Sequence, residues 1–394
     1  MSYLQIKKIN LETFFLLILI FTTAGLGAAW EINVGSASLN IETLLLLALG
    51  LYLIVKKSFF LDTFKNSNVI IIFSVIFLLL FLIVDFLIRK NNGAFYELSF
   101  LILLSSYPLS IYLHSRSKLA AHSPIWIIFI LISLNIIFLP NKGGAFDEWD
   151  LVTLEGSGIL NRLSILGYVS NALAIILLFH IVYCFEGLRK LHLVSIFSIF
   201  LCIYWISQTF SRIGILILVI LLIWEFWSLT KKSFILRILF ISFLSFIAIY
   251  QLSNILAALD LIFGTGRTNI FVNPRFSKWL SLMNQLQDNG IFGYLFGIGF
   301  FQMPSDNTFI GIFAGKGIIG LFLYLIVFIY GILSIFFTKF DRHKKRKILQ
   351  IIFILFSSAF TMDYFGQRKI IIISAVYIAA LIKKNNEILH PRRL

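Results

Sequence analysis

The 394-residue chain is 59% hydrophobic and only 13% charged, with a mean hydropathy of +0.96. A soluble domain of this length cannot be so apolar, so the composition excludes a soluble protein and indicates a chain that crosses a membrane many times. The net charge of +15 does not indicate nucleic-acid binding. The basic residues gather in one set of loops, and the orientation of the chain in a membrane accounts for most of the excess.

The apolar runs predict an all-α polytopic membrane protein, with a single transmembrane domain over residues 1–394. A span needs roughly 20 apolar residues, and runs of that order recur between charged residues. The first run lacks a convincing signal-peptidase site and is expected to be a retained helix. We expect about 12 transmembrane helices, at residues 11–28, 41–55, 69–88, 96–113, 125–140, 166–185, 193–210, 213–229, 238–255, 308–337, 348–361 and 370–382.

Lysine and arginine are concentrated in alternate loops, from Lys7 and Lys8 in the N-terminal tail to the run at residues 342–347 and the C-terminal tail. Basic residues in short loops stay on the cytoplasmic side of a membrane, so the alternation predicts that both termini are cytoplasmic. Arg89 and Lys90 are exceptions, because they fall in an outward loop.

The cysteines and histidines form no recognisable ligand pattern. Cys184 and Cys202 both lie in predicted spans, where we expect them to be packing residues rather than a disulfide or a thiolate metal site. All six histidines, His180 among them, fall in predicted cytoplasmic loops or near the cytoplasmic ends of spans. We therefore expect no bound metal or cofactor.

Two predicted outward loops are long, at residues 140–164 and 256–307. The first is acidic and rich in glycine. It is either a solvated loop or the source of a carboxylate that accepts a proton from a sugar hydroxyl. The sequence does not choose among its four carboxylates, which are Asp147, Glu148, Asp150 and Glu155.

The second long loop contains a helix signal at residues 274–288. Pro274 suits the first helical position, and Asn289-Gly290 ends the run. Apolar residues recur at helical spacing beside Arg275 and Lys278. This pattern predicts an amphipathic helix at the membrane surface, where it could roof a cavity that opens sideways into the bilayer.

Two arginines at predicted membrane boundaries, Arg212 and Arg267, need a physical reason, because a buried guanidinium is costly without a partner. Gly264 and Gly266, just before Arg267, would let the backbone approach a ligand closely. A guanidinium binds phosphate oxygens in a bidentate manner, so the pair suggests a pyrophosphate clamp. Alternatively, Arg212 reaches the outer headgroups and Arg267 is an ordinary loop cation.

Two further cations could face the same outward cavity. Lys316 lies inside the predicted span at residues 308–337, near its outer half, where an amine needs an anion or a wet cavity. Arg368 lies in the last outward loop, where it either joins an electropositive mouth or is a plain loop charge.

Five short pieces then occur in a fixed order: Ser211-Arg212, Gly266-Arg267, Phe296-Gly297-Ile298-Gly299, Asp306-Asn307 and Gly315-Lys316-Gly317-Ile318-Ile319-Gly320. In order and spacing this set resembles the bacterial O-antigen polymerase and O-antigen ligase superfamily. The motif region covers about residues 195–330, less than half of the chain. The many predicted spans agree with the resemblance over the remainder.

The resemblance implies a metal-independent glycosyltransferase of the GT-C type in the bacterial inner membrane, with its active site facing the periplasm. Its substrates would be undecaprenyl-pyrophosphate-linked repeat units, and a chain-length regulator is a partner only by analogy. Arg212 and Arg267 would stabilise the departing pyrophosphate, and Asp306 would orient or deprotonate the acceptor hydroxyl. The expected substrate-binding residues are Gly264, Gly266, Arg275, Lys278, Asn307, Lys316 and Arg368.

Ligases of this kind carry a His-Asn pair where this chain has Asp306-Asn307, so a polymerase fits better than a ligase. Asp306 could instead only cap the helix that follows, as could Ser305. The alternatives are an O-antigen ligase and, from another class, a transporter or flippase for lipid-linked sugars. Transporters usually show internal repeats and ionisable or glycine-broken positions near the bilayer midplane, and no repeat is obvious here.

Overall fold

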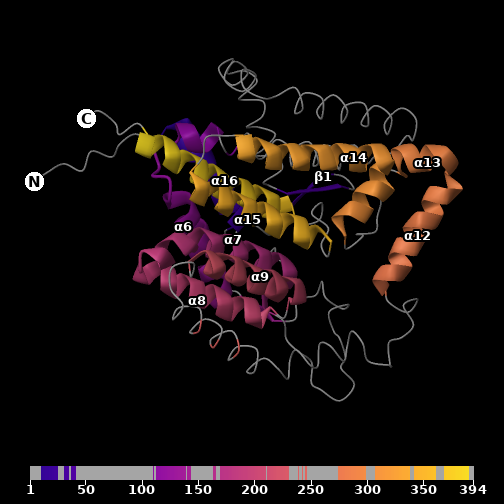
Figure 1. The fold of residues 1–394 in the computed structure, drawn as a ribbon. Helices are drawn as coiled ribbons and strands as arrows, with labels where there is room; N and C mark the ends of the chain where they lie inside the picture. Colours follow the sequence, from indigo (N-terminus) through magenta and orange to yellow (C-terminus); the bar gives the residue numbers. More distant parts are fainter. Residues whose placement is uncertain are drawn as a thin grey trace, which may run out of the picture.

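A computed structural model describes residues 10–24, 31–34, 37–40, 110, 112–138, 140–142, 163–165, 169–209, 211–229, 238, 242, 245, 274–298, 307–337, 341–360 and 368–389. These residues are mainly α-helical, as predicted, and the helices pack side by side (Figure 1). The described helices are α1 (Leu11–Ala24), α6 (Ser123–Phe138), α7 (Ser170–Arg189), α8 (Leu193–Gln208), α9 (Arg212–Leu229), α12 (Pro274–Asp288), α13 (Gly290–Phe296), α14 (Thr308–Phe337), α15 (Arg342–Ala359) and α16 (Arg368–Leu389).

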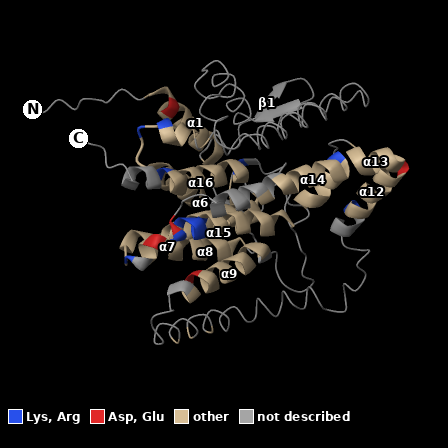
Figure 2. Ribbon diagram, turned by 45° about the horizontal axis from the view of Figure 1, so that its top comes forward, with Lys and Arg blue, Asp and Glu red and all other residues tan. Residues whose placement is uncertain are grey.

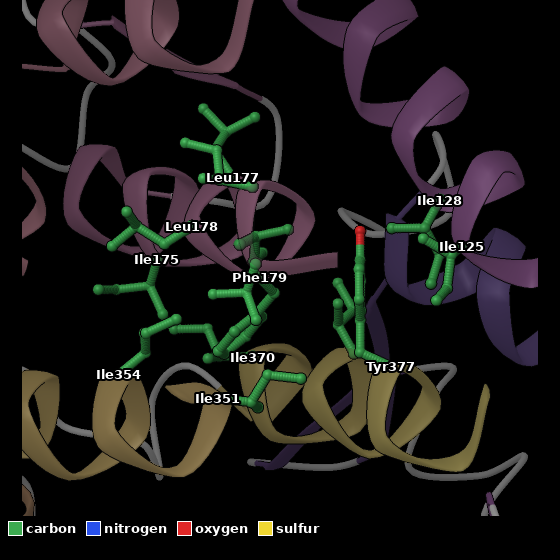
Figure 3. Close-up of a cluster of buried hydrophobic side chains, with 14 of the residues drawn as sticks. Ile125, Ile128, Ile175, Leu177, Leu178, Phe179, Ile351, Ile354, Ile370 and Tyr377 are labelled. Atoms are coloured by element: carbon green, nitrogen blue, oxygen red, sulfur yellow. The ribbon is translucent and has the colours of Figure 1, made fainter. Parts of the chain in front are cut away.

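Helix α7 lies at the centre of the hydrophobic core and packs against α8, α9, α15 and α16. It is apolar on all of its sides, which is why it is stable only where neighbours surround it. Phe179 of α7 meets Ile351 of α15 and Ile370 of α16 in this core, and Tyr377 of α16 reaches toward α6 (Figure 3). The core therefore joins segments from both halves of the chain.

The outer faces of several helices are apolar as well. On α8, Phe197, Phe200 and Tyr204 are more than half exposed, and α9 likewise exposes Leu216 and Trp227. Among the described residues, Ser170–Leu188 and Thr308–Ile326 are long and apolar enough to cross a membrane. Helices that are apolar on both buried and exposed faces fit a lipid surround better than water. The structure thus indicates membrane association.

Two short antiparallel strand pairs interrupt the helical architecture. Strand β1 (Glu31–Val34) pairs with β2 (Ala37–Asn40), and β3 (Pro140–Lys142) pairs with β4 (Leu163–Ile165). The sequence did not predict them, because strands of three or four residues are too short to show a period. The β3–β4 pair joins the two ends of the predicted acidic loop and anchors them on α6 and α7. The four carboxylates of that loop lie outside the described residues.

The helix bounds agree with the expected spans at some positions and differ at others. Helix α12 has the expected bounds, and α15 begins at Arg342 rather than at residue 348, so that it includes the basic run. Helix α14 also has the expected bounds, but Gly317 breaks it into two arms with φ 65° and ψ −167°. The sequence did not predict this break. The expected spans at 41–55 and 69–88, and most of those at 96–113 and 238–255, lie outside the described residues.

Candidate functional site

The predicted site residues fall into three groups in the structure. Lys278, Asn307 and Lys316 are described with their side chains. Arg212, Arg275 and Arg368 are placed in the first turns of α9, α12 and α16, but their side chains are not described. Outside the described residues lie Gly264, Gly266, Arg267 and Asp306. The clamp expected between Arg212 and Arg267 therefore stays a prediction.

Arg212 follows a rigid turn between α8 and α9. The buried Ser211 hydroxyl accepts a hydrogen bond from the Gly214 N–H at 3.2 Å, which caps the first turn of α9. A Cβ atom on Gly214 would lie 2.7 Å from the Cβ of Ala174, so glycine is needed for α9 to approach α7 this closely. The cap and the packing fix the backbone of Arg212 at the start of α9.

Asn307 is a helix cap in this structure. Its Oδ1 accepts hydrogen bonds from the N–H groups of Phe309 and Ile310, at 2.9 and 3.1 Å. Its Nδ2 donates to the carbonyl oxygen of Phe360, just past α15, at 3.0 Å. The cap of α14 is thus Asn307 rather than Ser305 or Asp306, and its buried amide ties α14 to α15.

The most closely packed feature of the described site joins α13 to the break in α14. A Cβ atom on Gly297 would lie 2.3 Å from the carbonyl carbon of Gly315, and one on Gly317 would lie 2.3 Å from the carbonyl group of Leu295. Both glycines have positive φ angles, which residues with side chains rarely adopt. Two pieces of the sequence motif therefore meet through their backbones.

The break in α14 also frees a backbone acceptor that α13 then uses. In an uninterrupted helix the carbonyl of Ala314 would accept a bond from the N–H of Ile318, four residues on. Here it accepts one from the N–H of Ile298 at 2.7 Å. This hydrogen bond and the two glycine contacts hold α13 against the break in α14. We call the residues at this contact the glycine junction: Gly297, Gly315, Lys316, Gly317 and Gly320.

Lys316 is only 2% exposed within the glycine junction. Gly320 makes room for it, since a Cβ atom there would lie 2.1 Å from the Cβ of Lys316. Burying an ammonium group is costly unless other groups compensate its charge. Lys278 of α12 is half-buried, and α12 packs on the first arm of α14 through Leu282, Leu286 and Ala314.

Charged side chains pair at the opposite end of the bundle, which we call the inner end. Arg346 of α15 lies 3.2 Å from Glu225 of α9. Lys347, also in α15, lies 3.1 Å from Glu186 of α7, and its ammonium donates to the carbonyl oxygen of Tyr183 at 3.3 Å. Figure 2 shows most of the described charges gathered at this end.

Lys383 of α16 completes the inner end. Its ammonium donates to the carbonyl oxygens of Ser117 and Leu119, at 2.9 and 2.7 Å, and so joins the end of α16 to the segment before α6. The amide of Asn10, just before α1, likewise donates to the carbonyl oxygen of Arg116. The predicted cytoplasmic segments that the structure describes therefore meet at one end.

The N-termini of α9 and α14 lie at the same end, away from the inner end. Arg212 lies 13 residues before Glu225, and the last residue of α15 lies 13 residues after Arg346. Both stretches are about 20 Å long at 1.5 Å per residue. Phe360, which accepts the bond from Asn307, follows α15 directly. Arg212 is therefore near the level of Asn307.

One polar cluster was missed by sequence reasoning. His180 lies halfway along α7, almost fully buried, with its Nδ1 3.2 Å from the Tyr377 hydroxyl and its Nε2 3.3 Å from the Cys184 sulfur. Its ring stacks on Phe129 of α6, with centroids 3.9 Å apart. The i, i+4 spacing of His180 and Cys184 was visible, but Tyr377 is 197 residues away in sequence.

The fold and these contacts define a mainly helical, membrane-associated protein whose charged groups pair at one end and whose glycine junction and helix caps lie elsewhere. No protein-family model and no curated protein sequence matches the chain.

Proposed function

We propose that this protein is a multi-pass inner-membrane O-antigen polymerase with both termini in the cytoplasm. In this proposal it is an inverting, metal-independent glycosyltransferase that joins undecaprenyl-pyrophosphate-linked repeat units at the periplasmic face. The observation that carries the proposal is the gathering of the N-termini of α9 and α14 at the end of the bundle away from the inner end. These N-termini bear Arg212 and Asp306-Asn307, the motif residues of the resemblance.

A third N-terminus supports the same site. Arg368 begins α16 and lies 15 residues before Lys383, which bonds at the inner end. A helix N-terminus carries the positive end of the helix dipole and favours an anion. Three such termini, each with a cation or a motif residue beside it, suit the pyrophosphate of a lipid-linked donor.

In the proposed reaction, the non-reducing-end hydroxyl of one lipid-linked repeat attacks C1 of the reducing-end sugar of another lipid-linked chain. The new bond joins the hydroxyl oxygen to C1, the bond from C1 to the phosphate oxygen breaks, and Asp306 takes the hydroxyl proton. Negative charge develops on the leaving pyrophosphate. Arg212 and Arg267, assisted by Arg275, stabilise that charge, and stabilisation that grows in the transition state lowers the barrier.

Lys316 has a different role in this proposal. Its side chain is buried in the glycine junction, and in this proposal its ammonium adds positive potential to the site. A fixed charge needs no reorganisation during the reaction, which makes it effective. Lys278 on α12 completes the substrate side of the proposed site, whereas the amide of Asn307 is engaged as the cap of α14.

The test is polymerisation by the purified full-length protein in nanodiscs, supplied with a lipid-linked repeat and analysed by gel. We expect a ladder spaced by one repeat. Arg212→Ala and Arg267→Ala should each reduce its rate by about 100- to 1000-fold, as is typical for the loss of one transition-state donor. Lys190→Ala is the matched control, because Lys190 is an exposed cation at the inner end.

If both arginine variants formed the ladder at an unchanged rate, the proposed pyrophosphate clamp would be refuted and the proposed polymerase activity would stand. Transfer of one unmodified repeat to a core-lipid acceptor, with no ladder, would instead indicate a ligase. Asp306→Asn removes the carboxylate and keeps the size of the side chain. A loss of rate with unchanged stability in this variant would support the base.

A transporter or flippase for lipid-linked sugars is the second candidate, and two observations favour it. His180 is buried halfway along α7, and Gly317 breaks α14. Ionisable and glycine-broken positions inside the membrane are common in transporters. In liposomes loaded with the lipid-linked repeat, protein-dependent exposure of the sugar to an external glycosidase, without any ladder, would favour this candidate.

A further inference from the structure

Helix α13 presents an apolar surface that no described element covers. Ile291 is 80% exposed, and Phe292, Tyr294 and Leu295 are 39 to 43% exposed. The helix contains no charged residue. Its other side is occupied, because a Cβ atom on the buried Gly293 would lie 2.5 Å from a carbonyl oxygen of α12. The exposed face is therefore an outward surface.

The glycine junction prevents α13 from turning this surface inward. Gly297 and Gly317 hold the C-terminal end of α13 against the break in α14 through backbone contacts. At its N-terminal end, α13 packs on α12, whose Leu286 is fully buried. A helix fixed at both ends cannot rotate to bury its exposed face.

This surface continues one on α14. Ile318, Phe322 and Ile329 of α14 are 55, 63 and 52% exposed, and their spacing places them along one face of the helix. Gly317, just before Ile318, lies against the backbone of Leu295 in α13. The exposed apolar residues of α14 therefore begin beside the C-terminal end of α13.

We propose that α13 is immersed in the acyl chains of the lipid leaflet at the end of the bundle away from the inner end. Residues Thr308–Ile326 of α14 are long and apolar enough to cross a membrane, so the exposed apolar residues of α14 would contact acyl chains, and the adjoining surface of α13 would meet the same lipid. With seven residues, α13 is about 10 Å long and too short to span a bilayer. It lies at shallow depth, and its aromatic Tyr294 suits the interface.

The proposal does not depend on the enzymatic activity. It requires only that α14 is inserted in a membrane.

Spin labels on introduced cysteines in nanodiscs test this proposal. Cys184 and Cys202 are buried and should not react in the folded protein, so the unsubstituted protein serves as the labelling control. The reporter is Ile291→Cys, with Leu295→Cys as a second variant on the same face. Phe322→Cys on α14 is the lipid reference, and Asp288→Cys at the exposed end of α12 is the water reference.

We expect oxygen, which partitions into lipid, to relax the label at position 291 more strongly than a water-soluble nickel complex does, as at position 322. At position 288 the order should reverse. A label at 291 that behaves like the one at 288 would overturn the proposal. Protection at 291 from both reagents would also overturn it, because protein and not lipid would then cover α13. If Ile291→Cys does not elute as one monodisperse species, Leu295→Cys takes its place as the reporter.

Discussion

The inner end and the glycine junction hold helices together by different physical means. At the inner end, long charged side chains reach across between helices, as Lys347 does to Glu186 and Arg346 does to Glu225. At the glycine junction, backbones touch directly because Gly297 and Gly317 have no side chains. Side-chain pairs tolerate small shifts, whereas backbone contact does not, so the junction should be the more rigid region.

This difference bears on where chemistry can occur. At the inner end, Arg346 and Lys347 are each paired with a glutamate. The glycine junction buries the side chain of Lys316, which is 2% exposed. Fixed, preorganised charge is what a reaction with a charged leaving group requires. Four substitutions test the comparison.

The largest effect is expected at the junction. Gly317→Ala should lower the free energy of unfolding by about 4 kcal/mol, because strain at this φ and ψ costs about 1 to 3 kcal/mol and overpacking about as much again. Gly290→Ala is the matched control. Gly290 also has a positive φ, of 59°, but nothing lies within 4 Å of an added Cβ atom. Unfolding by titration with dodecyl sulfate measures the free energy of unfolding of both variants. Equal losses of stability in the two variants would refute the close backbone contact at Gly317.

The buried ion pair of the inner end comes next. Glu225→Ala should cost about 3 kcal/mol, because it leaves the mostly buried guanidinium of Arg346 without its carboxylate. The control is Lys190→Ala. The Lys190–Glu186 pair has the same 3.2 Å separation, but its side chains are 72 and 37% exposed, so the loss should not exceed about 0.5 kcal/mol. Similar losses in the same unfolding titration would show that burial does not set the strength of these pairs.

A smaller effect is expected at the cap of α14. Asn307→Ala removes the acceptor of the Phe309 and Ile310 N–H groups and the donor to Phe360, and should cost about 1 to 2 kcal/mol. Asn307→Asp keeps the acceptor and loses only the donor. It should cost less in a thermal unfolding scan. An aspartate variant that loses as much as the alanine variant would place the stabilisation in the contact with α15 rather than in the cap.

The smallest effect is a pH dependence at the inner end. His114 follows the predicted span at 96–113, and burial, with the nearby charges of Lys383 and His122, lowers its pKa to about 4. Its ordinary pKa is 6.5, so below that value the unfolded chain binds a proton that the folded protein does not. The free energy of unfolding should therefore decrease as the pH is lowered, by about 1 kcal/mol from pH 7 to pH 5.5, and should level off below pH 4.

Above about pH 7.5 the imidazole of His114 is almost entirely neutral in both states and contributes almost no slope. Unfolding titrations of the parent protein and of His114→Gln, at pH 7 and at pH 5.5, give the contribution of this residue by difference. An equal loss of stability in the two proteins would assign the pH dependence to other groups.

Local sequence was sufficient for most of the described helices. The bounds of α12 follow from Pro274 at its start and Asn289-Gly290 at its end, because these residues act within one turn of the chain. Apolar runs likewise indicated α1, α6, α7, α8, α9 and α14, since burial in lipid or protein needs long apolar segments. The positions and residue types of Asn307 and Lys316 were also visible in sequence.

What these residues do depended on partners far away along the chain. Asn307 is a cap whose second bond goes to Phe360, and His180 meets Tyr377 from the other half of the protein. At the break in α14, the backbone of Gly317 lies against the backbone of Leu295 in α13, which leaves no room for a side chain. Sequence alone determined the apolar helices and the candidate polar residues, because propensity and hydropathy act locally. Only the tertiary structure decided which helix ends share a level and which side chains meet, because packing brings distant segments together.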